Sequence, residues 1–152
     1  MPIKTSRFDV DIISQTLAEV IQRPRLGTIN IGDVSGAVAA NTANLIMSIS
    51  GAGIHWGVYF WLTSTATQDN DYIRVVADGN SINLPTVKQL LDNNFIIPIG
   101  AEAFITLYDA VNFKYAGGGG AGKTWNTSYK LYYVETHGRT PTANLKYIYS
   151  LF

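Results

Sequence analysis

The fold is decided by one aromatic stretch, Ile54-His55-Trp56-Gly57-Val58-Tyr59-Phe60-Trp61-Leu62. Aromatic and β-branched side chains favour extended backbone, so we expect a strand over residues 54–65. Side chains on both faces of this strand are apolar or aromatic, which is typical of a strand covered on two sides. One cover is the protein's own core, and we expect the other to be a second subunit. The stretch is too short for a membrane-spanning helix, which needs about 20 apolar residues.

Outward from this stretch, short β-rich segments alternate with clusters of Gly, Asn, Asp and Ser, as in all-β sandwiches and barrels. The expected strands are 28–34, 45–50, 54–65, 72–77, 95–99, 103–115, 129–135 and 145–152, and the pattern is compatible with a short one at 81–84. Two turn sequences, Gln68-Asp69-Asn70-Asp71 and Asp78-Gly79-Asn80, indicate hairpin connections. We therefore expect an all-β, jelly-roll-like antiparallel β-sandwich.

Side chains alternate clearly in two of the expected strands. One apolar face holds Tyr129, Leu131 and Tyr133. The other holds Ile105, Leu107, Val111 and Phe113.

Two segments have helical spacing instead. The first begins at Asp9, ends before Pro24 and carries the apolar series Val10, Ile13, Leu17, Val20 and Ile21. It predicts a helical arm over residues 1–26, ahead of a sandwich domain over residues 27–152. The arm either packs on its own domain or docks on a neighbouring subunit or a membrane surface. The second segment, 84–92, predicts one short inserted helix with Pro85 in the first helical position.

Composition restricts the partners. The 152 residues include 11 basic and 11 acidic ones, so no net field attracts nucleic acid or an anionic membrane. Only 14% of residues are charged, against about 25% in an average soluble domain. A surface so poor in charge favours contact with other protein. The absence of cysteine excludes disulfides, thiolate metal sites and thiol nucleophiles.

One motif points to a nucleotide. Residues 117–124, Gly-Gly-Gly-Gly-Ala-Gly-Lys-Thr, match the phosphate-binding pattern G-x-x-x-x-G-K-[ST] at every specified position. That chemistry needs a helix beginning at the lysine, so that its amides face the phosphates. The sequence after Thr124 alternates like a strand, and we expect no helix there. We interpret 117–122 as a flexible hairpin loop with a solvated Lys123.

Other polar residues give little support for catalysis. Histidine occurs only at His55 and His137, too few for a multi-histidine metal site. We expect His55 at an edge or interface, and Asp69 and Asp71 in a solvated turn rather than a calcium loop. The exposed aromatic residues allow either subunit packing or a sugar-stacking platform. We expect no enzyme activity, no catalytic or metal-binding residues, no cofactor and no small-molecule substrate.

The size, strand count, sparse charge and 117–122 glycine segment resemble the single jelly-roll capsid proteins of tailless icosahedral viruses. The resemblance covers most of residues 28–152. It implies a shell subunit with no catalytic residues. Capsid proteins that package RNA commonly carry a Lys/Arg-rich arm, which this chain lacks. The resemblance therefore implies a shell over an internal membrane or another protein layer, as in double-stranded DNA viruses with internal membranes.

The sequence thus predicts a structural virion protein that self-assembles into a homodimer or larger capsomer. The alternative is a phage fibre or carbohydrate-binding β-sandwich module. The partners expected are further copies of the chain and a second virion protein, with possible proximity to a membrane and no direct nucleic acid contact. We expect synthesis in the host cytoplasm without a signal peptide. The candidate interface residues are Val10, Ile13, Leu17, Trp56, Tyr59 and Trp61.

Overall fold

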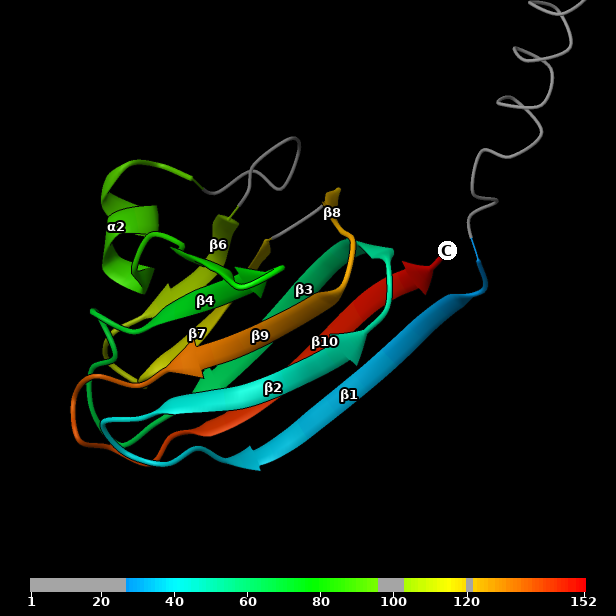
Figure 1. Ribbon diagram of the computed structural model, residues 1–152. Coiled ribbons are helices and arrows are strands. Elements are labelled where there is room, and N and C mark those ends of the chain that lie inside the picture. Colours follow the sequence, from blue (N-terminus) through cyan, green and yellow to red (C-terminus); the bar gives the residue numbers. More distant parts are fainter. Residues whose placement is uncertain (1–26, 96–102, 120–121) are drawn as a thin grey trace, which may run out of the picture.

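The computed structural model describes residues 27–95, 103–119 and 122–152, and most of them lie in strands (Figure 1). In chain order the elements are β1 (Ile29–Ala37), β2 (Ala43–Ser50), β3 (Gly53–Thr63), β4 (Tyr72–Ala77), β5 (Asn80–Asn83), α2 (Val87–Asp92), β6 (Ala103–Asp109), β7 (Lys114–Gly119), β8 (Lys123–Trp125), β9 (Ser128–Val134) and β10 (Thr142–Leu151). The expected arm over residues 1–26 and most of the expected strand 95–99 lie outside the described residues.

The strands form two antiparallel sheets that pack face to face (Figure 1). Sheet A has the order β1-β10-β3-β7-β6, with β8 also pairing with β3. Sheet B has the order β2-β9-β4-β5. When β6 and β8 are set aside, successive strands of the chain alternate between the sheets, except for the hairpin β4-β5 within sheet B, in the jelly-roll manner of two Greek keys. The expected jelly-roll-like β-sandwich is confirmed.

The core lies between the sheets and is built from their inward-facing residues. Sheet A contributes Val58 and Leu62 from β3, and sheet B contributes Leu131 and Tyr133 from β9, all nearly or fully buried. The predicted alternation of residues 129–133 is therefore confirmed. In β3 the described residues cover only one face, because Trp56, Tyr59 and Trp61 are exposed whereas Val58, Phe60 and Leu62 are buried.

The segment 103–115 is a hairpin and not the single strand expected. β6 and β7 pair with each other, and a turn over residues 110–113 joins them. The Asp109 carboxylate accepts hydrogen bonds from the backbone N–H groups of Val111 and Asn112, which closes the turn. Val111 is consequently 84% exposed, and Phe113 has a φ of 53°. The expected apolar alternation therefore does not continue beyond β6.

The short helix α2 begins at Val87, two residues later than expected. Thr86 is its N-cap and forms a reciprocal capping box with Gln89, so Pro85 lies outside the helix. The first helical N–H groups, of Val87 and Lys88, donate to the backbone carbonyls of Asp71 and Asp69. The segment 68–71 thus connects the two sheets and holds the helix, and the expected hairpin there is wrong.

The second predicted turn is confirmed. Asp78 and Gly79 have φ values of 50° and 83°, as a two-residue connection between β4 and β5 requires. The Asp78 carboxylate also accepts backbone hydrogen bonds from Asn126, Thr127 and Ser128. These bonds hold the pKa of Asp78 well below its usual range and fasten the hairpin to the turn before β9.

Candidate functional site

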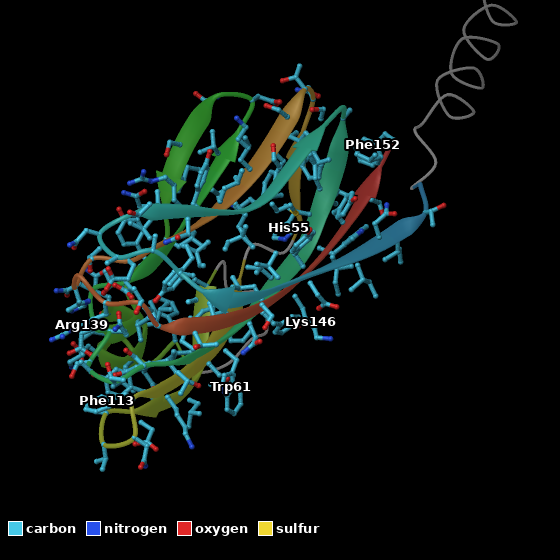
Figure 2. The ribbon with its side chains drawn as sticks, turned by 90° about the horizontal axis from the view of Figure 1, so that it is seen from below. His55, Trp61, Phe113, Arg139, Lys146 and Phe152 are labelled. Carbon is cyan, nitrogen blue, oxygen red and sulfur yellow. The ribbon has the colours of Figure 1, made fainter. Side chains whose placement is uncertain are left out.

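The outer face of sheet A exposes large apolar side chains. We call this surface the apolar face; its exposed members are Ile29 and Ile31 of β1 and Trp56, Tyr59 and Trp61 of β3, and the partly buried Ile148 of β10 is paired with Ile31. Ile31 is 68% exposed, Tyr59 54% and Trp61 48%. Figure 2 shows Trp61 and Lys146 pointing away from the sandwich, whereas His55 lies between the sheets.

Small residues on β7 leave the aromatic rings uncovered. Trp61 is paired with Ala116, and Tyr59 with Gly118. A Cβ on Gly118 would lie 2.4 Å from the Val58 carbonyl oxygen and 2.8 Å from the Phe104 ring. Glycine at this position therefore lets Phe104 of β6 reach across β7 and contact Tyr59 edge-on, with ring centroids 6.1 Å apart.

Charge is nearly absent from the middle of the apolar face. Asp33 of β1 and Lys146 of β10 form an ion pair at 3.4 Å, and both side chains are well exposed. Beside them Ser35 donates a hydrogen bond to the Asn144 side chain. A groove of about 540 Å³ runs between this polar pair and the rings of Tyr59 and Trp61.

Three of the predicted interface residues lie together on this face. Trp56, Tyr59 and Trp61 are all exposed, and the Trp56 indole N–H donates to the Ser150 hydroxyl at 3.1 Å. The other three, Val10, Ile13 and Leu17, lie outside the described residues. Sequence reasoning missed Ile29 and Ile31. Their two-residue spacing places them on one face of a strand, but it does not say which face points outward.

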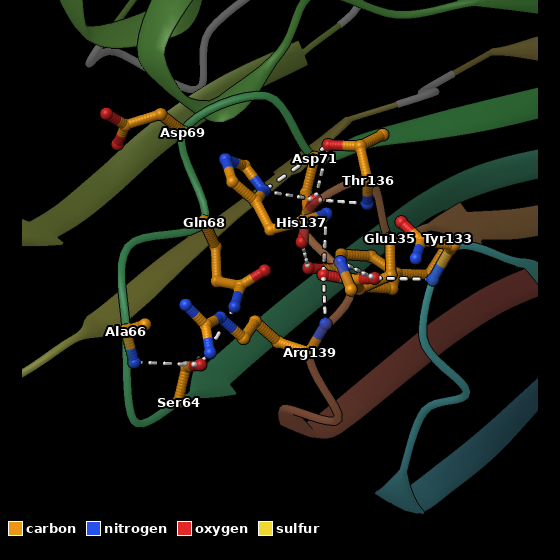
Figure 3. A network of polar contacts seen from close by, with 12 residues as sticks. Ser64, Ala66, Gln68, Asp69, Asp71, Tyr133, Glu135, Thr136, His137 and Arg139 are labelled. Carbon is orange, nitrogen blue, oxygen red and sulfur yellow. Dashed lines mark hydrogen bonds and ion pairs between the residues drawn. The ribbon is translucent and has the colours of Figure 1, made fainter.

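A second cluster, at the end of the sandwich where β9 connects to β10, joins Asp71, Glu135 and His137 (Figure 3). Their ligand-type atoms lie within 4.8 Å of one another. Asp71 accepts hydrogen bonds from the Tyr133 hydroxyl, from the N–H and hydroxyl of Thr136, and from His137 Nδ1.

The partner carboxylate, Glu135, is satisfied by backbone. Its two oxygens accept from the N–H groups of Asn41, His137, Gly138 and Arg139. Burial raises the pKa of Glu135, but the four N–H donors outweigh burial and hold it below its ordinary value. Hydrogen-bond donors already occupy the oxygens of both carboxylates. The cluster of Asp71, Glu135 and His137 therefore fits a structural role better than a metal site. The expectation that Asp71 lies in a solvated turn is wrong, because these donors compensate its full burial.

The glycine motif is only partly a loop. Gly117, Gly118 and Gly119 are buried residues of β7, so the expected flexible loop over 117–122 is wrong for them. A Cβ on Gly117 would lie 2.3 Å from the Phe104 carbonyl oxygen, which explains a glycine within a strand. Lys123 begins strand β8, and the expectation that no helix follows it is confirmed. The helix N-terminus that a phosphate needs is therefore missing from residues 123–152.

His55 belongs to the core, and its expected place at an edge or interface is wrong. Its side chain is fully buried, and Nδ1 lies 2.9 Å from the Tyr129 hydroxyl. The two rings also pack at a centroid distance of 5.0 Å. Burial raises the pKa of the Tyr129 hydroxyl. This pair lies between the sheets, near the start of β3 and of β9.

No family model matches the chain, and no curated protein sequence matches it. Among solved structures, a chain of the cyanophage Pam1 capsid asymmetric unit is 14% identical, with a TM-score of 0.41 over 84% of this chain and 87% of that one. An Aeromonas sobria serine protease is 13% identical, with a TM-score of 0.35 over 91% of this chain. The same protease with its chaperone gives 11% and 0.32 over 92%.

This chain spans about 30% of the length of the protease chains. Likenesses this distant carry no argument about function, and the fold assignment rests on the strand order itself. Within the described residues, no helix is long and apolar enough to cross a membrane.

Proposed function

We propose that this protein is a structural virion protein, a capsid subunit that self-assembles through the apolar face. One observation carries the proposal: an ordered sheet surface that exposes two tryptophans, a tyrosine and isoleucines around a single ion pair. Soluble monomers rarely leave such a contiguous apolar surface in water. Aromatic enrichment and depletion of charge are also the properties of the buried centre of protein interfaces.

A second copy of the chain suits this face. Asp33 and Lys146 neutralise each other within one subunit. In a dimer with two-fold symmetry, each copy presents both Asp33 and Lys146 to the other copy. Each of these side chains can then pair with the opposite charge on the neighbouring copy, so no charge is left unpaired. A strongly acidic or basic partner has no comparable counter-charge on the middle of this face.

The choice of a virion, among other assemblies, rests on the resemblance to single jelly-roll capsid proteins and on the agreeing strand order. The fold alone does not imply that function. In the proposed role the protein is not an enzyme and needs no cofactor. It is made in the host cytoplasm and incorporated into the virion, where it contacts further copies of itself and a second virion protein.

Sedimentation velocity across a concentration series tests the assembly. We expect the unmodified chain to form dimers or larger species at micromolar concentration. Trp61→Glu places a charge in the face and should raise the required concentration at least tenfold, about 1.4 kcal/mol. Leu45→Glu is the matched control, because Leu45 is 54% exposed on the outer face of sheet B. A chain that stays monomeric at high micromolar concentration, or equal effects of the two variants, would contradict the proposal.

The groove supports one alternative, a phage fibre or carbohydrate-binding module. Tyr59 and Trp61 offer rings for stacking on a sugar, and Asn144 and Ser35 stand beside them as hydrogen-bonding groups. A glycan array probed with the unmodified chain distinguishes the two functions. Specific binding that Trp61→Ala abolishes, from a chain that remains monomeric, would favour the module. Silence on the array together with assembly favours the capsid subunit.

A further inference from the structure

The edge strands of the two described sheets differ in how well they are protected. Sheet A ends at β1 and β6, and sheet B at β2 and β5. β5 has only four residues. The pairing register shifts within β2 and within β6, and the Ile105 N–H of β6 already donates to the Phe95 carbonyl. Short strands, bulges and covering segments are the devices by which proteins prevent pairing between sheet edges.

β1 is the edge strand without such a device. Its nine residues pair with β10 from Ile29 to Ala37 without a register shift, and they include neither proline nor lysine. In Figure 1 β1 forms the border of sheet A, and no other strand of the described residues pairs with it. A strand presents backbone N–H and C=O groups to both of its sides, so this edge is a template for one further strand.

The side chains of β1 fit a second copy of the same strand. Ile29, Ile31 and Asp33 alternate with half-buried residues and are exposed together on the outer face. In antiparallel pairing about a two-fold axis, residues at equal distances from the axis stand opposite each other. An axis at Asp33 would set two carboxylates directly opposite each other, which destabilises a sheet. An axis at Asn30 instead sets Ile29 opposite the second copy's Ile31, and such apolar cross-strand pairs stabilise the pairing.

This register leaves the charges of the face balanced. It pairs residues 27–33 of each copy, so Asp33 stands opposite Gly27 of the second copy. Asp33 then keeps its own partner, Lys146, at 3.4 Å. The pairing therefore brings no like charges together and leaves none without a counter-charge.

We infer that β1 pairs antiparallel with β1 of a second copy about a two-fold axis at Asn30, which joins the two A sheets into one continuous sheet. The inference rests on the proposed self-assembly and names a second contact within it. Ile29 and Ile31 keep their outer surfaces exposed, and the apolar faces of the two copies become one surface across the axis.

The edge contact adds to burial of the apolar face and does not replace it. Two strands paired in isolation are only marginally stable in water, so pairing through β1 alone would be weak. Two self-complementary contacts on one chain also permit an assembly larger than a dimer, because each contact is satisfied by a different copy.

A single cysteine on the two-fold axis tests the inference, because the protein has no cysteine of its own. Opposite residues of an antiparallel pair have Cα atoms about 4.5–5.5 Å apart, within the range that a disulfide spans. Asn30→Cys should therefore form a disulfide with its own copy when oxidised glutathione is added to the full chain. Ser35→Cys is the control on the same strand, since the proposed register separates it from its copy by about 33 Å.

We expect the disulfide-linked dimer to form at least tenfold faster with Asn30→Cys than with Ser35→Cys. The comparison is strict, because Ser35 is the more exposed residue and would react faster in random collisions. Equal rates, or faster linkage of Ser35→Cys, would overturn the inference. A strand of a different protein on this edge would also give no preferred linkage at residue 30. Circular dichroism verifies that the sandwich is intact in both variants.

A second measurement uses charge at the axis. Asn30→Lys places two ammonium groups opposite each other and should raise the concentration needed for assembly at least tenfold in sedimentation velocity. Asn30 is not a member of the apolar face, so this effect does not come from lost apolar surface. Ser81→Lys adds the same charge to β5, the exposed edge strand of sheet B, and is the control. Equal effects of the two variants would overturn the inference.

The edge contact and the proposed function fail in different ways. A chain that stays monomeric contradicts the proposed function, and the edge contact with it. A chain that assembles while Asn30→Cys and Ser35→Cys link at equal rates contradicts the edge contact alone. Assembly that is weakened by Asn30→Lys but not by Trp61→Glu supports the edge contact and contradicts association through the apolar face.

Discussion

The two outer faces of the sandwich differ although the same kind of sheet underlies both. On sheet A, Tyr59 and Trp61 stand in one strand with Ile31 on the edge. On sheet B the corresponding rows hold Ser48 beside Lys130, and Tyr132 beside Arg74. Arg74 is further bonded to Tyr72 and Asn83. The outer face of sheet B also exposes Leu45 beside Tyr132, but charged side chains stand in its rows, as in an antiparallel sheet that faces water.

The contrast does not come from the number of charges. The described strands of sheet A carry five charged residues and those of sheet B two, Arg74 and Lys130. It comes from the large aromatic and aliphatic side chains that sheet A exposes on its outer face. Packing between the sheets needs only the inner faces. The apolar outer face of sheet A is therefore not a requirement of the fold, and it is the surface on which a function should be tested first.

The largest expected effect comes from the glycine that supports the apolar face. Gly118→Ala would place a Cβ 2.4 Å from the Val58 carbonyl oxygen, so the free energy of unfolding should fall by about 2–3 kcal/mol. Gly57→Ala is the matched control, since its Cβ would meet nothing closer than 3.8 Å. Denaturant titrations of both variants measure the difference. Equal stabilities would show that Phe104 and Tyr59 do not depend on this glycine.

The next largest effect is a pH-dependent change in the stability of the fold, caused by the buried carboxylate of Glu135. The pKa of Glu135 lies below its ordinary value, about 4.3, so ionised Glu135 stabilises the fold above that pH, and this contribution is lost as pH falls through the folded-state pKa. Glu135→Gln should therefore be less stable than the unmodified chain at pH 7, and the gap should narrow toward pH 3. Thermal unfolding across this range measures it. If the difference in stability between the two proteins does not change with pH, the charge of Glu135 does not stabilise the fold.

A third prediction makes the polar face resemble the apolar one. Arg74→Trp adds a large aromatic side chain in the row with Tyr132, so a second apolar patch arises on the opposite side of the sandwich. Two such patches permit open-ended association, and light scattering should begin at about tenfold lower protein concentration. Arg74→Gln, which removes the charge without adding apolar surface, is the control. Identical scattering from both would mean that charge, not apolar area, limits association.

The smallest effect is expected from the ion pair on the apolar face. Both partners are largely exposed, so Asp33→Asn should change the free energy of unfolding by less than about 0.5 kcal/mol. Its effect on association should be larger than its effect on folding, because the variant leaves Lys146 without its counter-charge at a subunit contact. Comparing sedimentation with denaturant titration tests this order. A loss of stability without any change in association would place the pair outside the interface.

The sequence predicted best where local chemistry decides the structure. The strand β4 and the Asp78-Gly79 turn were both expected, because β-branched residues end at residues that adopt positive φ. It predicted less where partners are distant along the chain. The sequence around Asp71 predicts a solvated turn, and only the structure shows that Tyr133 and Thr136 donate hydrogen bonds to its carboxylate.

The direction of β1 is the clearest case of such a failure. Ile29 and Ile31 would ordinarily be assigned inward, yet Asn30 and Gly32 face the interior side. A Cβ on Gly32 would lie 2.1 Å from the Tyr147 ring, so that ring occupies the space where a side chain of β1 would otherwise pack. Only the register between β1 and β10 shows that Ile29 and Ile31 face outward.

The pairing of β1 with β10 also determines when the apolar face can form during synthesis. Ile29 and Ser150 are paired neighbours across the sheet although about 120 residues separate them in the chain. Pairings of such long sequence separation form slowly and late. The apolar face is therefore incomplete until β10 has left the ribosome, and a nascent chain cannot present it to another copy. The topology thus delays completion of this apolar surface until β10 has been made, which limits its exposure during synthesis.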